Sequence, residues 1–240
     1  IRFDLGHDRA EDALNLSREF LERYPENSEI GMSQARALIR LGRFSEAISF
    51  LETFRVLPYE GATAGRLVYH EACVRAAMEE LAEGRYRAAA DYAEKAKLWP
   101  ANLGVGKPYD PDNRLDDFLI AIAARRENRE AAAAAAFAEA AGYRNPGDRE
   151  EDSRLLLQLL ALRAGGKEAE AGALLDGFRR KQPGNKYLRW VEARFREPGK
   201  ARELEREILA PAGEIQPYDV AYVDREFQLV ADVADLMEAW

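Results

Sequence analysis

The apolar positions of this chain recur at helical spacing in short runs, and turns that contain glycine or proline separate the runs. In the stretch 41–58, Gly42 ends one helix, because glycine readily takes the left-handed conformation of a helix C-terminus. Ser45 suits the free amides at the start of the next helix, and Pro58 ends that helix. The apolar face of this second helix consists of Ala47, Leu51 and Phe54.

This helix–turn–helix unit recurs twice. The equivalent positions are Gly84, Ala89 and Pro100 in the stretch 81–100, and Gly166, Ala171 and Pro183 in the stretch 161–183. A repeated helical hairpin is typical of a solenoid, in which each unit packs only on its neighbours. We therefore predict an all-α chain, about three-quarters helical and without strands. The predicted architecture is a right-handed superhelical stack of antiparallel hairpins with about twelve helices.

The pattern predicts one helical-repeat domain over residues 1–240, in which 1–5 are the remnant of an upstream element. The units are expected at about 8–27, 28–60, 62–100, 113–145, 149–184 and 185–210, followed by a C-terminal capping helix at 217–240. The predicted helices are 8–24, 28–41, 45–57, 63–83, 85–99, 113–126, 129–141, 149–164, 167–181, 185–196, 199–209 and 219–240. Ser28, and Asp112 or Asn113, are the expected caps of two of them.

The stretch 101–113 interrupts the pattern with two glycines and two prolines, so it cannot form a regular helix. A long loop inside a compact repeat array suggests a contact loop. Gly104, Gly106 and Lys107 superficially resemble a phosphate-binding loop. That chemistry needs a Ser or Thr after the lysine and a preceding strand, whereas Pro108 follows here. The sequence therefore argues against nucleotide binding.

Composition limits the possible functions. The chain has 35 Lys and Arg against 43 Asp and Glu, a formal net charge of −8, which argues against a general nucleic-acid binder. Cys73 is the single cysteine, so there is no intrachain disulfide and a cytoplasmic location is permitted. His7 and His70 are far apart, which disfavours a His/Cys metal site. No apolar run is long enough to predict a membrane span.

We expect no catalysis from this chain, and no metal or cofactor. Two histidines do not provide a Ser/His/Asp or Cys/His set. The acidic runs 79–80 and 150–152 place adjacent carboxylates on diverging sides of a helix, so we interpret them as solvated faces. Because the chain begins at Ile1 within an incomplete repeat, we expect it to be a piece of a longer protein whose targeting signals would lie upstream.

The glycine, aromatic and alanine positions of the stretches 42–47 and 84–89 resemble the tetratricopeptide repeat (TPR), as do the prolines that end both units. The stretches lack the tryptophan and the Leu-Gly pair that this family carries in its first helices. The resemblance implies a binding scaffold in which the first helix of each pair lines a concave face.

A narrower resemblance rests on the segments 98–109 and 112–118, which read LWPANLGVGKPY and DNRLDDF. They are similar to a segment of large bacterial proteins that join a galactose-mutarotase-like β-domain of unknown function to a C-terminal TPR region. This resemblance implies the alternative function, an accessory helical domain of a carbohydrate-active enzyme that packs against an upstream β-domain. The reading frame upstream of Ile1 would discriminate the two functions.

Basic side chains on predicted first helices are the candidate binding residues. They are Arg36, Arg40, Arg75 and Arg114, with Lys107 and Tyr109 from the 101–113 loop. Guanidinium groups bind carboxylates by paired hydrogen bonds, so an acidic protein segment or the chain's own upstream domain is the predicted partner. Scattered surface arginines paired with nearby glutamates are the alternative interpretation.

Overall fold

The computed structural model describes residues 1–7, 9–58, 63–145, 150–210 and 224–238. The chain is 75 % helical, and the described residues contain thirteen α-helices and no strand, which confirms the predicted all-α class. The helices are α1 (Arg2–Gly6), α2 (Ala10–Arg23), α3 (Ser28–Arg40), α4 (Phe44–Thr53), α5 (Ala64–Ala82), α6 (Tyr86–Ala96), α7 (Arg114–Arg126), α8 (Glu130–Gly142), α9 (Leu155–Ala164), α10 (Glu168–Lys181), α11 (Lys186–Arg196), α12 (Ala201–Leu209) and α13 (Arg225–Glu238), with short 3₁₀ turns η1 (Ala101–Leu103) and η2 (Pro198–Lys200).

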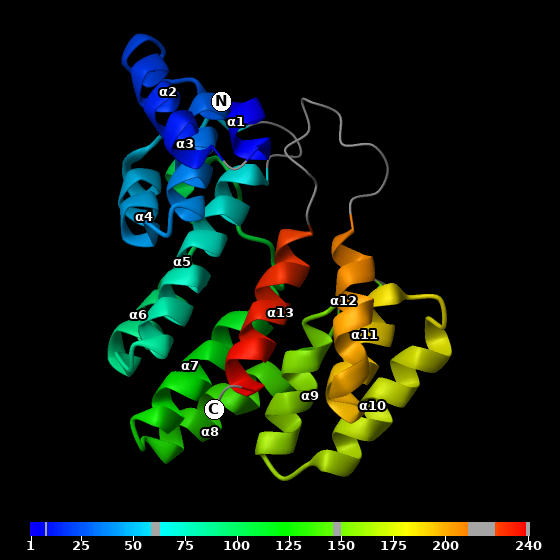
Figure 1. Ribbon diagram of the computed structural model, residues 1–240. Coiled ribbons are helices and arrows are strands. Elements are labelled where there is room, and N and C mark those ends of the chain that lie inside the picture. The colour runs from blue at the N-terminus through cyan, green and yellow to red at the C-terminus, as the bar shows by residue number, and fades with distance from the viewer. Residues whose placement is uncertain (8, 59–62, 146–149, 211–223, 239–240) are drawn as a thin grey trace. The chain divides into compact units, whose positions relative to one another are not determined.

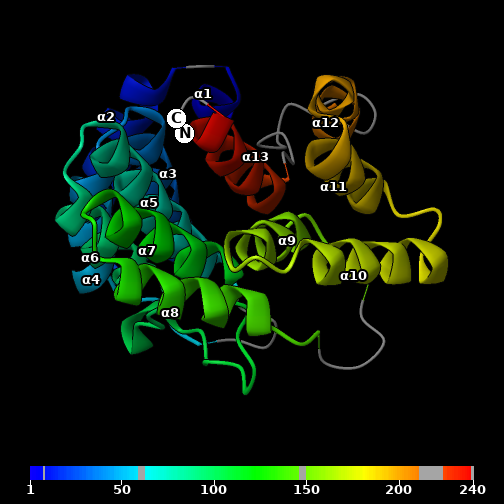
Figure 2. The same cartoon turned by 90° about the horizontal axis from the view of Figure 1, so that it is seen from below.

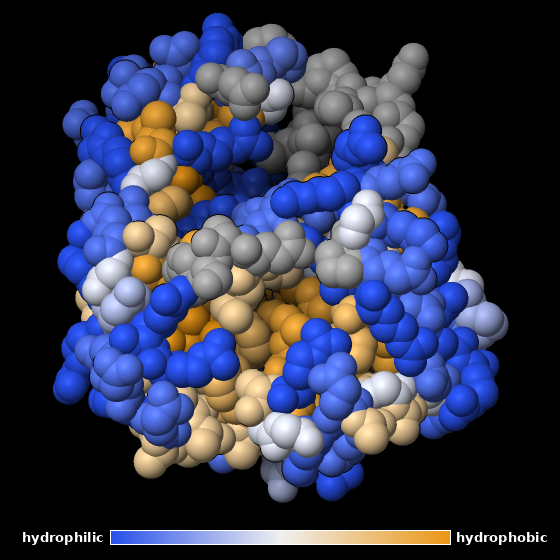
Figure 3. Space-filling model, turned by 60° about the horizontal axis from the view of Figure 1, so that its bottom comes forward, coloured by the Kyte–Doolittle hydropathy of each residue, from blue (hydrophilic) through white to orange (hydrophobic). Residues whose placement is uncertain are grey.

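The described residues form two compact units. Unit 1 contains 1–76 and 95–109, so it includes α1 to α4, the first part of α5 and η1 (Figure 1). Unit 2 contains 77–94, 110–210 and 224–238, with α7 to α13. Each unit has its own buried core, with Leu14, Leu38, Ile48 and Leu51 in unit 1 and Phe118, Leu157, Leu175 and Trp190 in unit 2. Figure 3 shows a face of the molecule on which hydrophobic side chains gather in the lower middle between hydrophilic ones.

Four helix–helix turns share one hydrogen-bond pattern. The backbone N–H of the third residue of each turn donates to the carbonyl of the residue five positions earlier. The carbonyl of the same third residue accepts from the backbone N–H of an alanine four positions later. The third residues are Arg43, Arg85, Arg129 and Lys167, and the alanines are Ala47, Ala89, Ala133 and Ala171. The residue before each basic position has a positive φ, 71° at Gly42, 76° at Gly84, 58° at Asn128 and 75° at Gly166. The first, second and fourth of these turns were predicted from glycine, whereas the asparagine turn was not.

Two connections between hairpins are also alike. Tyr24 and Gln182 end α2 and α10 with nearly the same backbone angles, φ and ψ of −134° and 65° against −132° and 62°. The side chains of Asn27 and Asn185 then accept hydrogen bonds from the first backbone amides of α3 and α11. The predicted cap at Ser28 is wrong by one residue, because Asn27 places its carboxamide oxygen 3.1 Å from the amide of Ile30.

Helices adjacent in sequence pack together from α1 to α4 in unit 1 and from α7 to α12 in unit 2, and in unit 2 the first helices of successive pairs also touch. In that unit α7 contacts α9, and α9 contacts α11. This order of contacts is the one expected of stacked hairpins. The three helices α7, α9 and α11 together define what we call the first-helix face of unit 2.

Several predicted boundaries are wrong for identifiable reasons. The segment 1–5 belongs to a short helix, α1. Helix α4 ends at Thr53 because Phe54 is extended, with ψ of 138°. Helix α9 starts at Leu155, whereas the sequence predicts a start at residue 149. The residues just before Leu155 form hydrogen bonds with one another and with distant side chains instead of helical ones. Helix α13 begins at Arg225; the predicted residues 219–223 and 239–240 lie outside the described residues, as does part of the predicted turn 142–148.

Candidate functional site

The C-terminal helix α13 lies on the first-helix face of unit 2 (Figures 1 and 2). The ring of Phe227 stands edge-on to Trp190 of α11, with 4.9 Å between ring centroids, and lies 5.9 Å from the ring of Tyr187. Phe227 and Val230 are both fully buried. An aromatic anchor in an apolar setting is the usual centre of a helix-binding surface.

Polar contacts fix the direction of α13. The hydroxyl of Tyr187 donates to Asp224, which precedes the helix and also accepts from the amide of Phe227 at 3.0 Å. At the other end, Asp235 accepts from Arg194 of α11 and, at 2.6 Å, from Arg202 of α12. Carboxylates at both ends of α13 thus meet hydroxyl and guanidinium donors of its own chain.

A cleft of about 410 Å³ adjoins α13 within unit 2. Its apolar lining comes from Phe118, Phe137, Leu156, Leu160, Ala164, Ala234 and Met237. Three arginines complete the lining: Arg125, Arg163 and Arg194. All three lie over aromatic rings, since the guanidinium of Arg125 is 5.2 Å from the centroid of Phe137, that of Arg163 is 3.9 Å from Phe195 and that of Arg194 is 5.8 Å from Trp190. The cleft therefore combines apolar and cationic surface.

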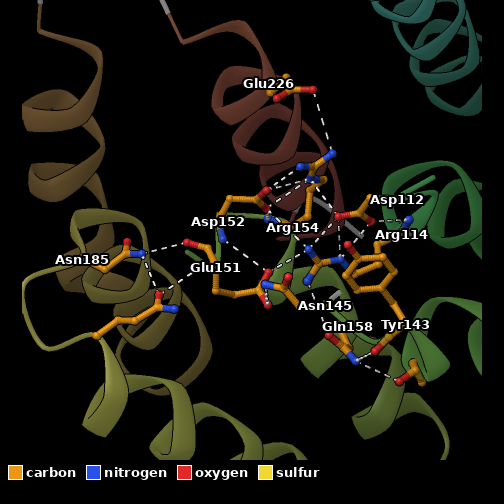
Figure 4. Close-up of polar contacts among 12 residues, drawn as sticks. Asp112, Arg114, Tyr143, Asn145, Glu151, Asp152, Arg154, Gln158, Asn185 and Glu226 are labelled. Atoms are coloured by element: carbon orange, nitrogen blue, oxygen red, sulfur yellow. Dashed lines mark hydrogen bonds and ion pairs between the residues drawn. The ribbon is translucent and has the colours of Figure 1, made fainter. Parts of the chain in front are cut away.

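A buried ionic cluster lies at the start of α7 (Figure 4). Arg114 is 2 % exposed, and each of its side-chain nitrogens has a partner. Nε and Nη2 donate to Asp112, Nη2 also donates to Glu151 at 2.8 Å, and Nη1 donates to Gln158 at 3.4 Å. The guanidinium lies 4.3 Å from the centroid of the Tyr143 ring. A cation so buried and so paired with carboxylates is not exposed to a ligand.

Arg154 extends the cluster toward α13. Its guanidinium donates to Asp152, lies 3.2 Å from an oxygen of Asp112 and is 3.9 Å from Glu226. Burial opposes ionisation here, but the hydrogen bonds and charge of Asp152, with the charges of Asp112 and Glu226, outweigh it and raise the pKa of Arg154. Burial likewise pushes the pKa of Asp152 upward, yet Arg154 and Arg114 bring it below its usual value. Both groups therefore stay charged at neutral pH.

The same cluster joins three loops by neutral hydrogen bonds. Gln158 donates to the carbonyls of Ala141 and Tyr143 at 3.0 and 2.9 Å, at the end of α8. Asn185, the cap of α11, donates to the carbonyl of Glu151 at 2.8 Å. The cluster thus connects the end of α8 and the starts of α7, α9 and α11. Its geometry positions helices, and its carboxylates face arginines instead of an open cleft.

The predicted binding residues fall into different environments. Arg36 and Arg40 lie on α3, where Arg40 donates to the carbonyl of Leu5 in α1. Arg75 lies on α5 and pairs with Glu71 of its own helix at 3.2 Å. These three arginines belong to unit 1, whereas Arg114 belongs to unit 2. The expectation that Arg114 lines an exposed groove is wrong, because its side chain is buried among carboxylates.

The 101–113 loop is divided between an internal part and an exposed part. Asn102 donates to the carbonyls of Leu51 and Phe54 at 2.8 and 2.7 Å, and its own carbonyl accepts from Val56 at 2.8 Å. Lys107 and Tyr109 are exposed, Tyr109 to 97 %. The first part of this loop therefore closes the end of α4, and only the second part is open to a partner.

The sequence interpretation missed the ionic cluster and the contacts of α13. The acidic run 150–152 was assigned to a solvated face, which is wrong for Glu151, whose residue surface is 2 % exposed. A usable signal was present: Asp152 and Arg154 repeat the spacing and residue types of Asp112 and Arg114. In both pairs the carboxylate accepts from the backbone and side chain of the arginine two residues on. The predicted cap at Asp112 or Asn113 is therefore an Asp112–Arg114 contact.

The described residues offer neither a metal site nor a membrane-spanning helix. No group of three or more His, Cys, Asp or Glu side chains there could hold a metal ion. None of the described helices has the length and apolar character needed to cross a membrane. Comparison of the chain with protein-family models, curated proteins and solved structures finds no match. Functional inference accordingly rests on the geometry given above.

Proposed function

We propose that this chain is a non-catalytic helical-repeat scaffold that binds protein segments across the first helices of its hairpins. The observation that carries this proposal is the position of α13, an amphipathic helix that lies on α9 and α11. A buried aromatic ring and carboxylates of α13 and of the residue before it make the contacts. A surface that accepts such a helix from its own chain has the chemistry to accept a protein segment. The recurring turns support a TPR-like superhelical stack as the architecture.

In unit 1 we propose a related surface for an external acidic segment. Arg36, Arg40 and Arg75 lie on the first helices α3 and α5, and Lys107 and Tyr109 are the exposed contributions of the loop. Arg114 is left out because its side chain is buried and pairs with Asp112 and Glu151. An acidic segment or a C-terminal carboxylate is the favoured partner, since guanidinium groups bind such anions with two hydrogen bonds.

The experiment first identifies the partner and then measures its affinity for the chain. A photo-crosslinking amino acid at position 40, on α3, should capture a partner that the same amino acid at position 87, on α6, does not. With that partner purified, the double variant Arg36→Gln, Arg75→Gln should raise Kd by at least about tenfold. Circular dichroism checks that removing the Arg75–Glu71 pair leaves the fold intact.

The matched control is Arg87→Gln with Arg180→Gln. Both residues are exposed on second helices, α6 and α10, and neither forms an ion pair with the described residues. Arg179 is unsuitable as a control because it pairs with Glu192 at 3.0 Å. Equal affinities of the two double variants for the partner would reject the first-helix surface of unit 1.

A further inference from the structure

Six large apolar side chains are exposed among the described residues, all in unit 1, and all but Tyr109 belong to two patches whose charged members have opposite signs. The aromatic–acidic patch consists of Phe20, Glu22, Tyr24 and Glu26, at the end of α2 and in the turn that follows. The leucine–basic patch consists of Leu57, Leu67 and Leu98 with Arg55 and Lys107. Tyr24 is 56 % exposed and Leu57 78 %. Contiguous exposed apolar side chains indicate interaction surfaces more often than isolated ones do.

Three contacts bring the segments of the leucine–basic patch together. The amide of Val56 donates to the carbonyl of Asn102 at 2.8 Å. The guanidinium of Arg66 donates to the carbonyl of Ala96 at 2.6 Å and lies 4.6 Å from the centroid of Trp99. Each exposed leucine is the sequence neighbour of one of these residues, Leu57 of Val56, Leu67 of Arg66 and Leu98 of Trp99. The leucines therefore belong to one region of unit 1.

The charged members of both patches are available for a new contact. Glu22 and Glu26 form no ion pair with the described residues, and neither do Arg55 and Lys107. Many other surface charges of unit 1 are paired, as Glu19 is with Arg23. Two acids on the segment that carries the exposed aromatic rings and two bases on the segments that carry the exposed leucines make the two patches complementary in both charge and apolar character.

Both patches lie at the same end of the hairpins of unit 1. The ring of Phe54 occupies the space beside Gly31, where a Cβ would stand 2.1 Å from the ring. Gly31 lies in the first turn of α3, directly after the turn that carries Tyr24 and Glu26. The segment from Phe54 to Leu57 therefore runs close to that turn. Two complementary patches at one end of a chain permit a two-fold contact, in which each copy covers both patches of the other.

We infer that a second copy of this chain binds here, with the aromatic–acidic patch of each copy on the leucine–basic patch of the other. The geometry allows a closed dimer, because both contacts form at once between the same two copies. This contact shares Lys107 with the unit 1 surface proposed for an acidic segment, but it uses neither the first-helix face of unit 2 nor the arginines Arg36 and Arg75, so the two proposals can fail separately.

Sedimentation equilibrium of the whole chain tests this inference. The average mass should rise with protein concentration from 27.0 kDa toward twice that value and no further. The variant Glu22→Lys, Glu26→Lys and the variant Arg55→Glu, Lys107→Glu should each weaken self-association at least about tenfold. An equimolar mixture of the two variants should restore it, because every contact in the mixed dimer again joins opposite charges. That restoration also shows that both variants are folded.

The control variant Arg87→Glu, Arg180→Glu changes the net charge by the same amount as the second variant and should dimerise as the parent chain does. A parent chain that stays monomeric up to about 0.5 mM would overturn the inference. If each of the two double variants is impaired alone and their mixture does not recover self-association, the inference would also be overturned, and the patches would be assigned to a different protein.

Discussion

Asn102 in unit 1 and Arg114 in unit 2 both connect a loop to the ends of helices, but they use different chemistry. The carboxamide of Asn102 donates two hydrogen bonds to carbonyls at the end of α4. The guanidinium of Arg114 is held by Asp112 and Glu151 in a buried cluster that also includes Arg154. Both residues were predicted to lie on or near a partner-binding surface, and both contact their own chain instead.

These two connections differ in the free-energy penalty that follows when one partner is lost. A neutral amide that loses its partner leaves a carbonyl without a hydrogen bond, which is a modest penalty. A buried ion pair that loses one partner leaves an uncompensated charge in a region of low polarisability. The Arg114 cluster should therefore respond strongly to substitution and to acid, whereas the Asn102 connection should respond weakly to substitution and not to acid.

The largest expected effect is that of Arg114→Ala. It leaves Glu151 buried without its cation, and such a loss typically costs about 3–5 kcal/mol of unfolding free energy. Urea or guanidinium denaturation followed by circular dichroism measures this change. Arg180→Ala, an exposed site without a described ion pair, should change stability by less than about 0.5 kcal/mol. Equal stabilities of the two variants would show that the cluster is not a stabilising connection.

A glycine pair within one loop tests the unit 1 connection. Gly104 has a φ of 69°, and a Cβ there would stand 2.8 Å from the carbonyl oxygen of Val56, whereas a Cβ on Gly106 would meet nothing within 4 Å. Gly104→Ala should destabilise the chain by roughly 2 kcal/mol, from the left-handed backbone and the close contact together. Gly106→Ala should be nearly neutral. Similar melting temperatures for both variants would contradict the tight path described for this loop.

Much of the fold could be predicted because the local signals agree with the tertiary contacts. Gly42, Gly84 and Gly166 mark turns that require a positive φ. The prolines are a poorer signal, since α4 and α6 end at Thr53 and Ala96, before Pro58 and Pro100. The turn at Asn128 was predicted only as the gap between the helices 113–126 and 129–141, because its left-handed residue is not glycine. The end of α4 was predicted too late because its carbonyls are bonded by Asn102, 51 and 48 residues away in sequence.

The candidate site was less predictable because it depends on contacts between residues that are far apart in the sequence. Whether an arginine near a helix start faces solvent or the interior depends on where carboxylates come to lie after folding. Glu151 and Gln158 are 37 and 44 residues away from Arg114, and no local pattern indicates that they meet it. The position of α13 on α9 and α11 also depends on contacts between distant segments, such as Phe227 with Trp190.

A smaller effect is expected from Asn102→Ala. The carbonyls of Leu51 and Phe54 would lose their donor, which should cost about 1–2 kcal/mol. Because no charge is involved, the loss should be the same at pH 7 and at pH 4. Denaturation curves at both values measure it. A loss that grows or shrinks strongly between them would mean that Asn102 acts through a titrating group.

The smallest effect, and the one that most directly separates the two connections, is the pH dependence of Asp152. Its pKa in the folded chain lies below its usual value, since Arg154 and Arg114 outweigh the effect of burial. An aspartate of the unfolded chain titrates near pH 3.9. A carboxyl with a lowered folded pKa therefore stabilises the fold above about pH 3.9, and this contribution is lost as the pH falls through the folded pKa.

Asp152→Asn should accordingly lower the melting temperature at pH 7, and the difference from the parent chain should shrink steadily below pH 4. Asn102→Ala, measured in parallel, should keep a constant difference until acid unfolds both proteins. A pH-independent effect of Asp152→Asn would show that Asp152 contributes through hydrogen bonds alone, and the contrast between a charged and a neutral connection would then fail.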